Sequence, residues 1–525
     1  MTFRSELTWE GMKASGLEAD YHSSYEKAAD DLLAMVRGGP MIYPNHIDGA
    51  PSLAQRTFED VSPSDRDLVV GRFQRSSAEE VSCAIRSSRN TFLEWSRMDW
   101  GDRVRIFERA AELMRRDKFA LAAAITLDNG KTRHEAVADV DEAIDFIDYY
   151  SEEMRRTDGF ERTPGAAYPE EEVSLRLRPY GTWAVICPFN FPLAISAGMA
   201  AGALITGNTV VMKPSSDAPL PVHLFYEIMD RAGLPPGVLN VVAGSGGEAG
   251  DALVNSDAVD GIAFTGSLEV GRRLMRSSAE SGRRIIAEMG SKNPVIVSGE
   301  ADLEAATDGV AASAFLFSGQ KCSACSRLYV HELVYGTFMA MLIERASRMT
   351  VGDPFDRETD IGPLITEQAM DNYLRWTEMA HRDGKLSLGG EPARTSGPRG
   401  LFAHPAIVES LPEEHYLMRR ELFVPILCVQ SYRTLQDAVV RANASEYGLT
   451  AGIFSSNETE VRYFLETIES GVVYANRRRG ASTGAMVGSQ SFAGWKSSGS
   501  TGMGTGSHHY LPQFMREQSR TVIRQ

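Results

Sequence analysis

Residues 182–214, TWAVICPFNFPLAISAGMAAGALITGNTVVMKP, are the stretch from which the fold can be predicted. TWAVIC at the start and NTVVMKP at the end are short apolar runs typical of buried strands. Between them, Leu193 to Ile205 are small and apolar, which favours a buried helix. A strand, a helix and a second strand in this order indicate a parallel α/β unit.

The same stretch has no charged residue from 179 to 212, so it must also be considered as a membrane span. A spanning helix needs about 20 mostly apolar residues in one continuous run. Here prolines, glycines, Asn190 and Asn208 interrupt the run. The first 20 residues also lack the apolar centre of a signal peptide. We therefore predict a cytoplasmic protein without a membrane partner.

The alternation of strands and helices continues on both sides of this unit. Residues 75–155 have helical spacing, and Asp128-Asn129-Gly130 marks the end of one helix within them. Further strand and helix patterns follow up to 299. A second alternating region covers about 300–475. Since 525 residues are too many for one core, we expect two or three domains. Residues 1–45 are weakly patterned and predict an extension of the main fold.

Two segments do not follow this alternation of strands and helices. EVSLRLRPYG (172–181) alternates apolar and charged residues, which predicts a protruding strand suited to a subunit contact. The region from 476 onward is rich in glycine and serine. Because a well-patterned end, YLPQFMREQSRTVI, follows it, we predict an ordered loop rather than a flexible linker.

Charge and cysteine content restrict the possible functions. The net charge of −16 argues against general binding of nucleic acid, which requires a basic surface. The five cysteines are few, odd in number and scattered. This favours a reducing compartment and argues against a disulfide scaffold.

Cys322, in SGQKCSACSR, is the candidate nucleophile. A free thiol has a pKa near 8.5, so only about 3% is ionised at pH 7, and a cation such as the adjacent Lys321 would raise that fraction. The alternatives are a buried inert cysteine, or a redox pair or half zinc site formed with Cys325. No second CxxC occurs and His331 lacks a matching partner, so we predict no metal.

Glu288, at the end of an apolar run in IIAEMGSKNP, is a candidate general base, because apolar surroundings raise the pKa of a carboxylate. The alternative is a structural glutamate in a salt bridge. The loop GSGGEAG (244–250) follows a predicted strand and precedes a helix, as a phosphate-binding turn does. Its GxGxxxG spacing is weak evidence on its own. FTGS (264–267) is a second turn of this kind.

Taken together, six motifs occur in the order and approximate spacing of the aldehyde dehydrogenase superfamily, which the chain resembles over roughly residues 45–525. They are CPFNFP (187–192), VMKPS (211–215), FTGS (264–267), AEMGSKNP (287–294), GQKCS (319–323) and ELFVP (421–425). Six ordered motifs are far more specific than one glycine loop.

The resemblance implies an α/β fold with three parts. These are a Rossmann-type cofactor domain (1–171 and 183–288), an α/β catalytic domain (289–485) and a small β oligomerisation element (172–182 and 486–525). It also implies a homodimer or an assembly of dimers.

The same resemblance assigns the catalytic roles. Cys322 would attack the aldehyde, Asn190 and the backbone N–H of Cys322 would hold the oxyanion, and Glu288 would activate the deacylating water. NAD would be the cofactor, with NADP possible because Ser216 stands where many NAD-preferring members have glutamate. The residues implied in cofactor binding are Ile186, Pro188, Lys213, Ser216, Gly246, Gly250, Phe264, Gly266, Ser267, Glu421 and Phe423.

Within the family, EAIDFIDYY (142–150), PFNFPLAI (188–195), QKCSACSR (320–327), RGASTGAMVG (479–488) and the final YLPQF resemble the 1-pyrroline-5-carboxylate dehydrogenases. This implies oxidation of L-glutamate γ-semialdehyde to glutamate in proline degradation. Lys321, Ser323 and the backbone of Gly484 and Ala485 would hold the substrate carboxylate. Glu142 would face the ammonium, unless it is a solvated helical glutamate. Phe191 and Phe492 would enclose the methylene chain.

Several positions depart from that branch. Ser491 and Ala493 stand in the usual PFGG, His508-His509 replaces Pro-Asp, and the loop 499–507 is one residue longer. Ser318 replaces a larger residue, and Val424 replaces the glycine of EIFGP. Another semialdehyde or aldehyde is therefore the alternative substrate, and a catalytically silent homologue is the alternative from a different class.

Overall fold

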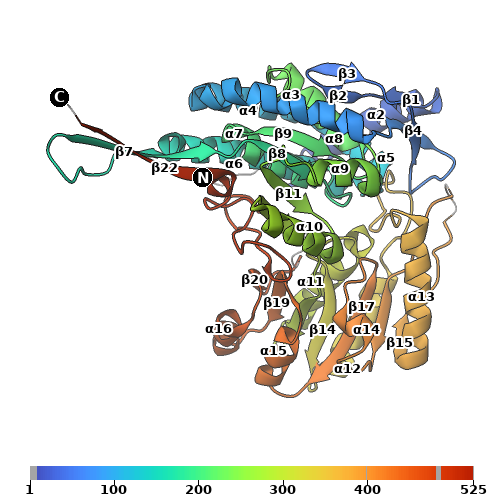
Figure 1. Ribbon diagram of the computed structural model, residues 1–525. Coiled ribbons are helices and arrows are strands. Elements are labelled where there is room, and N and C mark those ends of the chain that lie inside the picture. The colour runs from blue at the N-terminus through green and yellow to red at the C-terminus, as the bar shows by residue number, and fades with distance from the viewer. Residues whose placement is uncertain (1–8, 396, 398, 480–485, 524–525) are drawn as a thin grey trace.

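The computed structural model describes residues 9–395, 397, 399–479 and 486–523, and its largest features are two seven-stranded sheets (Figure 1). In the first sheet, five parallel strands are followed by two antiparallel ones. In spatial order they are β12 (Arg284–Glu288), β11 (Gly261–Thr265), β8 (Thr182–Ile186), β9 (Thr209–Lys213), β10 (Leu239–Val241), β2 (Asn45–Ile47) and β3 (Ala50–Ser52).

The strand order of the first sheet reverses at β8. From β8 the chain runs outward through β9 to β10, then returns to the other side of β8 to form β11 and β12. In open parallel sheets, ligands bind at the carboxyl ends of the strands where the order reverses. The segments that leave β8 and β11, which begin at Cys187 and Gly266, therefore border the expected ligand crevice.

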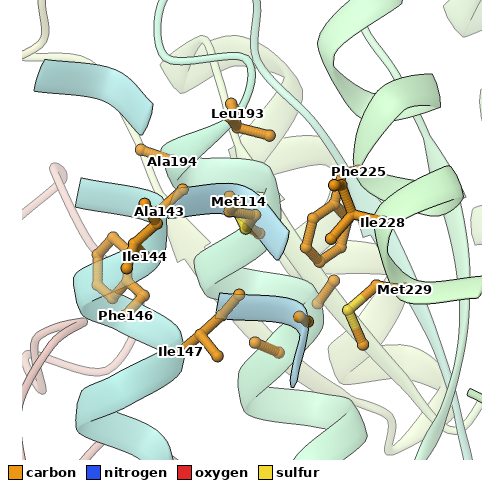
Figure 2. Packing of buried hydrophobic residues seen from close by; sticks show 14 of the residues in the cluster. Met114, Ala143, Ile144, Phe146, Ile147, Leu193, Ala194, Phe225, Ile228 and Met229 are labelled. Atoms are coloured by element: carbon orange, nitrogen blue, oxygen red, sulfur yellow. The ribbon is translucent and has the colours of Figure 1, made fainter. Parts of the chain in front are cut away.

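Both faces of this sheet are buried, and adjacent side chains of one strand enter different cores. In β8, Trp183 and Val185 lie in one core and Ala184 lies in the other. The first face is covered by α4 (Trp100–Arg116), α5 (Lys118–Asn129), α6 (Arg133–Arg156), α7 (Ala194–Ile205) and α8 (Leu220–Arg231). Figure 2 shows buried side chains of α4, α6, α7 and α8 in this core. The second face is covered by α3 (Ala78–Arg97), α9 (Asp251–Val254) and α10 (Leu268–Ser281).

The second sheet is parallel except for one edge strand. Its order is β15 (Lys385–Leu388), β16 (Ala406–Glu409), β17 (Ile426–Tyr432), β14 (Cys325–His331), β13 (Asn293–Val297), β19 (Thr450–Phe454) and β20 (Val472–Ala475). One face packs against α11 (Leu303–Phe315) and α12 (Tyr335–Ser347). The other packs against α13 (Glu367–Asp383), α14 (Tyr416–Arg419), α15 (Leu435–Asn443) and α16 (Glu458–Thr467).

A long antiparallel arm projects from the body of the molecule (Figure 1). It pairs β7 (Glu171–Pro179) with β22 (Met515–Ile523) over nine residues each, and β6 (Glu161–Arg162) adds a short third strand. The arm is shorter than the predicted element 172–182 and 486–525. Thr182 belongs to β8, and Tyr510 and Phe514 pack in the core of the first sheet. As folding units, the three predicted domains remain a prediction.

The remaining strands form small sheets at the edges. β1 (Met41–Tyr43), β5 (Val69–Gln74) and β4 (Thr57–Val61) make a three-stranded sheet, and β18 (Tyr447–Gly448) pairs with β21 (Trp495–Lys496). The described part of the chain contains no helix of the length and apolar character that a membrane crossing needs.

The weakly patterned N-terminal segment is helical and packed onto the body. It contains α1 (Trp9–Ala14) and the twenty-residue helix α2 (Glu18–Arg37). Tyr21 and Tyr25 of α2 are fully buried, and the Tyr25 hydroxyl donates a hydrogen bond of 2.6 Å to Thr126. The apolar pattern of α2 is weak because aromatic side chains with polar atoms make its buried contacts.

Candidate active site

Cys322 lies in the turn between α11 and β14, which we call the cysteine loop (residues 316–324). Its first part has an unusual backbone, since Phe317 and Ser318 have φ of 52° and 53° and Gly319 has φ of 66°. Non-glycine residues adopt this left-handed conformation only where the surroundings hold them there. The Ser318 hydroxyl donates a hydrogen bond of 2.7 Å to the carbonyl of Gly362, which provides such an anchor.

Gln320 fixes the middle of the cysteine loop to the same neighbouring segment. Its side-chain oxygen accepts a 2.9 Å hydrogen bond from the N–H of Ile365, and its Nε2 donates to the carbonyl of Pro363 at 3.1 Å. Because Gln320 is completely buried, these bonds face no competition from water. The loop is therefore held on this side by side-chain hydrogen bonds.

Asn293, at the start of β13, holds the other side of the loop. Its Nδ2 donates to the carbonyls of Cys322 at 2.7 Å and Ala324 at 2.8 Å, and its Oδ1 accepts from the N–H of Thr450 at 2.9 Å. The Ser291 hydroxyl also donates to the Cys322 carbonyl. Asn293 thereby joins the cysteine loop to the segment that follows Glu288.

Three carboxylates influence the thiol of Cys322. Burial is the largest cause that raises the pKa of this thiol, and the charges of Glu421, Glu288 and Glu142 raise it further. These glutamates come from distant parts of the chain, so the fold brings them together around Cys322. In this state the thiol is protonated at neutral pH, and a base must remove its proton before it can act as a nucleophile.

Burial and the three glutamates, rather than the charge of the adjacent Lys321, dominate the pKa of the Cys322 thiol. Lys321 Nζ instead lies 2.7 Å from Glu135 of α6, in an ion pair whose side chains are 4% and 12% exposed. A neighbouring carboxylate neutralises most of the field that the ammonium would exert on the thiol. Sequence adjacency did not decide which way the lysine points.

Glu288 has the properties of a base. Burial raises its pKa to about 8, and the N–H of Gly494 donates a hydrogen bond that opposes this rise. Its Oε2 is buried and has no hydrogen-bond partner among the described residues. A carboxylate with such a pKa takes up a proton near neutral pH and releases it slightly above. The predicted alternative, a salt-bridged structural glutamate, does not describe this environment.

A short strip of the C-terminal region continues the sheet beyond Glu288. The N–H of Met289 donates to the carbonyl of Ser498 at 2.8 Å, and the N–H of Ser500 donates to the carbonyl of Ala287 at 3.0 Å. Between them, Glu288 and Gly499 form an antiparallel bridge. Residues 498–500 thus fix the backbone that carries the candidate base.

In the first sheet, Lys213 ends β9. It is buried, and burial lowers the pKa of its ammonium to about 8. Its Nζ donates a hydrogen bond of 2.7 Å to the carbonyl of Pro214. Close by, the Ser216 hydroxyl donates to the carbonyl of Gly244 at 3.0 Å. Lys213 is therefore a cation available at the carboxyl end of the sheet.

The glycine turn, Gly246–Gly250, follows β10 and forms one wide helical turn that leads into α9. A Cβ added at Gly246 or Gly247 would have no protein atom within 4 Å, so there is open space beside both residues. At Gly250 the nearest atoms belong to the Lys213 side chain, 3.6 Å away. The turn thus leaves room for a ligand next to Lys213.

The three residues predicted in the second turn, Phe264, Gly266 and Ser267, all have structural contacts. Ser267 is exposed, and its hydroxyl accepts a hydrogen bond from Val270 as the N-cap of α10. Phe264 is 4% exposed and lies in the hydrophobic core. The N–H of Gly266 donates to the carbonyl of Glu288 at 3.1 Å, which joins this turn to β12. Ile186 and Pro188 lie at and after the end of β8.

Glu421 lies between α14 and β17 and accepts a 2.7 Å hydrogen bond from the N–H of Ser291. Burial raises its pKa to about 7. Phe423 adopts a φ of 57°, and its ring packs edge-on against Phe189 at 5.7 Å. The departure at Val424 does not disturb this turn, because Phe423 takes the left-handed conformation and the Val424 side chain is buried.

Several of the predicted substrate residues are buried. Glu142 and Phe191 are 7% exposed, so Glu142 is not a solvated helical glutamate. Ser323 is buried, and its carbonyl accepts a hydrogen bond from Thr450. The backbone of Phe492 pairs with Thr505 through two hydrogen bonds of 3.1 Å. Gly484 and Ala485 lie outside the described residues. Asn190, the predicted oxyanion donor, is also buried.

Sequence reasoning missed the residues that support this constellation. Asn129 was used only as part of a helix-ending signal, yet its Nδ2 donates to the carbonyl of Phe189 at 3.2 Å. Lys131 pairs with Asp139, also missed, in a bond that is completely buried. One pattern in the sequence could have indicated these residues. Glu135, Asp139 and Glu142 have the spacing that places three carboxylates on one face of α6.

The CxxC alternatives receive no support from the geometry. Cys325 is buried in β14 and its sulfur contacts the carbonyl of Arg327 at 3.5 Å. All five cysteines have free thiols. Among the residues that the structure describes, no three His, Cys, Asp or Glu side chains are arranged as a metal site.

The sequence of the chain matches one known protein family over most of its length. Residues 51–519 match the sequence profile of the aldehyde dehydrogenase family. The chain therefore belongs to the aldehyde dehydrogenase family. Its relatives in Bacillus cytotoxicus and Geobacillus kaustophilus are both named 1-pyrroline-5-carboxylate dehydrogenase. Each is 37% identical, and the alignments cover 92% and 91% of this chain and 93% and 92% of the relatives.

Solved structures of aldehyde dehydrogenases have folds similar to that of this chain. A 1-pyrroline-5-carboxylate dehydrogenase from Thermus with bound NAD has a TM-score of 0.90 and 33% identity, covering 95% of this chain and 96% of that one. A betaine aldehyde dehydrogenase from Staphylococcus aureus in complex with NAD+ has a TM-score of 0.88 and 27% identity, covering 94% and 97%. The predicted fold class, a Rossmann-type part with an α/β catalytic part, is confirmed.

Proposed function

We propose that this NAD(P)-dependent aldehyde dehydrogenase oxidises L-glutamate γ-semialdehyde, the open form of 1-pyrroline-5-carboxylate, to glutamate in proline degradation. The observation that carries the proposal is the convergence of Glu142, Glu288 and Glu421 on the thiol of Cys322. The relatives named 1-pyrroline-5-carboxylate dehydrogenase support the choice of substrate.

The residues at the strand ends fit a dinucleotide. Lys213 offers a buried ammonium beside the open space at Gly246 and Gly247, where glycines allow a phosphate to approach the backbone. Glu421, an acceptor already fixed by Ser291, suits a ribose hydroxyl. NAD is the proposed cofactor, and Ser216 is compatible with NADP because it places no negative charge near a 2′-phosphate. When bound, the nicotinamide accepts the hydride of the reaction.

In the proposed chemistry, Glu288 first removes the proton of the Cys322 thiol, for which its pKa of about 8 is suited. The sulfur then bonds to the aldehyde carbon. Asn190 and the backbone N–H of Cys322 donate hydrogen bonds to the oxygen, and one such donor is typically worth about 3–4 kcal/mol. Loss of hydride leaves a thioester on Cys322. After Glu288 has passed the thiol proton to solvent, it takes a proton from water, whose oxygen bonds to the acyl carbon, displaces the sulfur and releases glutamate.

Substrate selection is proposed to depend on Glu142. Its carboxylate is buried and acts on the thiol of Cys322, so a substrate ammonium near this thiol meets a negative charge. Glu135, on the same helix, is instead paired with Lys321. Ser323 and the predicted donors Gly484 and Ala485 would hold the carboxylate of the substrate, and Phe191 and Phe492 its methylene chain.

The two histidines that depart from the family pattern differ in exposure from three of the residues proposed to bind the substrate. His508 and His509 are exposed, whereas Glu142, Phe191 and Ser323 are buried. This supports the view that the departure does not alter substrate selection.

Comparing kcat/KM across a panel of aldehydes tests the substrate. We expect glutamate γ-semialdehyde to exceed succinic semialdehyde at least about tenfold, because only a substrate with an ammonium gains an ionic contact with Glu142. The variant Glu142→Gln should lose that preference while its rate with succinic semialdehyde changes little. Equal kcat/KM for both aldehydes in the unmodified enzyme would favour the alternative, another semialdehyde.

The assembly and the compartment are proposed on separate grounds. The nine-residue pairing of β7 with β22 makes an arm that suits a homodimer or an assembly of dimers. Exposed apolar side chains at its tip, Val522 and Ile523, support a contact there. The five free thiols support a reducing compartment such as the cytoplasm. Light scattering of the protein with and without residues 515–525 measures the assembly.

A further inference from the structure

Two buried ion pairs join α6 to its surroundings on different faces of the helix. Lys131 Nζ lies 2.8 Å from Asp139 Oδ2, and both side chains are completely buried. Lys118 pairs in the same manner with Asp141, and both are almost as deeply buried. Two residues along a helix rotate a side chain by about 200°, so the two aspartates point in nearly opposite directions.

The Lys131 ammonium contacts two aromatic rings of the active-site region. Its Nζ lies 3.5 Å from the centroid of the Phe191 ring and 5.2 Å from that of Phe317. A desolvated cation over an aromatic face is held more strongly than one exposed to water. Phe191 borders the predicted substrate space, and Phe317 belongs to the cysteine loop. One buried charge therefore fixes side chains from both segments.

Asp139, the ion-pair partner of Lys131, binds the C-terminal end of the segment that carries Phe191. Its Oδ1 accepts a hydrogen bond of 2.7 Å from the N–H of Ala194, the first residue of α7. At the start of the segment, Asn129 holds the carbonyl of Phe189. Figure 2 shows Leu193 and Ala194 packed beside Ala143 of α6. The segment 189–194, which includes Phe191, is thus fixed at both ends by α6 and the turn before it.

We propose that the Lys131–Asp139 pair is a positioning and specificity device, which sets the Phe191 ring against the substrate chain. The inference rests on the proposed function in one respect, namely that Phe191 lines the space for a substrate chain. Because the pair acts through Phe191, it matters for aldehydes long enough to touch that ring. A short aldehyde that reaches only Cys322 and Asn190 gains little from it.

The test compares two matched double variants of the full chain. Lys131→Met with Asp139→Asn removes the charges but leaves an oxygen that accepts from Ala194, and Lys118→Met with Asp141→Asn removes the other buried pair. For each, KM and kcat are measured with glutamate γ-semialdehyde and with propanal. We expect the first variant to raise the ratio of the KM for glutamate γ-semialdehyde to the KM for propanal about tenfold, because a desolvated cation–π contact is lost. The second should leave this ratio unchanged.

A Phe191→Leu background separates positioning from a general loss of structure. If Lys131 acts through Phe191, the effect of removing the pair on the KM ratio should disappear in that background, since coupled residues are not additive. An unchanged ratio, an equal change in the Lys118 variant, or an undiminished effect in the Phe191→Leu background would each overturn the proposal. If the panel selects another semialdehyde, the ratio is measured with that compound and propanal, so an error in the substrate does not affect this test.

Discussion

The cysteine loop precedes β14 of the second sheet, the glycine turn follows β10 of the first, and the two are held in different ways. The cysteine loop is anchored by Ser318, Gln320 and Asn293 through buried hydrogen bonds to neighbouring strands and loops. The glycine turn has open space at Gly246 and Gly247, and an exposed ion pair between Arg56 and Glu248. The loop proposed to form a covalent bond is fixed before substrate arrives, whereas the turn proposed to receive a nucleotide is left open.

Removing the sulfur should have the largest effect. Cys322→Ala is expected to reduce NADH formation about 10⁴-fold or more, since no covalent intermediate can form. Cys325→Ala, in the neighbouring strand, is the matched control and should retain activity within a few-fold. Activity of the Cys322→Ala protein equal to that of the unmodified enzyme would contradict the cysteine mechanism and leave the catalytically silent homologue as the better description.

Neutralising the base should come next. Glu288→Gln is expected to lower kcat about 10²–10³-fold, because water then lacks a base for deacylation. The burial that raises the pKa of Glu288 to about 8 also predicts that kcat of the unmodified enzyme rises as pH increases through 8. Stopped-flow measurement of NADH and a pH profile check both points, and a flat profile between pH 6 and 9 would count against Glu288 as the base.

The same substitution should change the pH dependence of stability. A carboxyl whose pKa is higher in the folded state stabilises the fold below its ordinary pKa near 4.5, and this contribution is lost as pH rises through 8. Glu288→Gln should therefore match the unmodified protein near pH 4.5 and exceed its stability above pH 8, by a gap on the order of a few kcal/mol. Urea unfolding at the two pH values measures the gap.

A variant that loosens the cysteine loop tests whether buried hydrogen bonds hold that loop in place. Asn293→Ala removes four hydrogen bonds, three of them buried, and should cost about 3 kcal/mol of stability. It should lower kcat roughly 10–100-fold, because a small displacement of the nucleophile is expensive. Ser291→Ala, which removes one bond to the same carbonyl, should have a clearly smaller effect on both. Similar effects in the two variants would mean that Asn293 is not the main clamp.

A substitution that fills the open space at the glycine turn should have the smallest effect. Gly246→Ala adds a methyl group where no protein atom lies within 4 Å, so stability should change by less than about 0.5 kcal/mol. The KM for NAD should rise a few-fold if a phosphate approaches this backbone. Titration of NAD binding by protein fluorescence provides the measurement. Unchanged affinity would place the phosphates elsewhere in the crevice.

The difference between local patterns and long-range contacts also explains what could be predicted from the sequence. The apolar run 182–187 corresponds to β8, and the small-residue run 193–205 corresponds to α7, because both are set by local patterns. The pairing of Lys131 with Asp139 was not predictable, since buried polar contacts depend on how separate segments meet. The same reason applies to the thiol of Cys322, whose pKa depends on carboxylates from three distant segments.

The bridge between Glu288 and Gly499 has a consequence for how the enzyme is made. The backbone of the base is completed by residues that leave the ribosome long after its own strand has been synthesised. Chains fold from the N-terminus as they are produced. The strand that carries Glu288 therefore reaches its final pairing only after residues 498–500 have been synthesised.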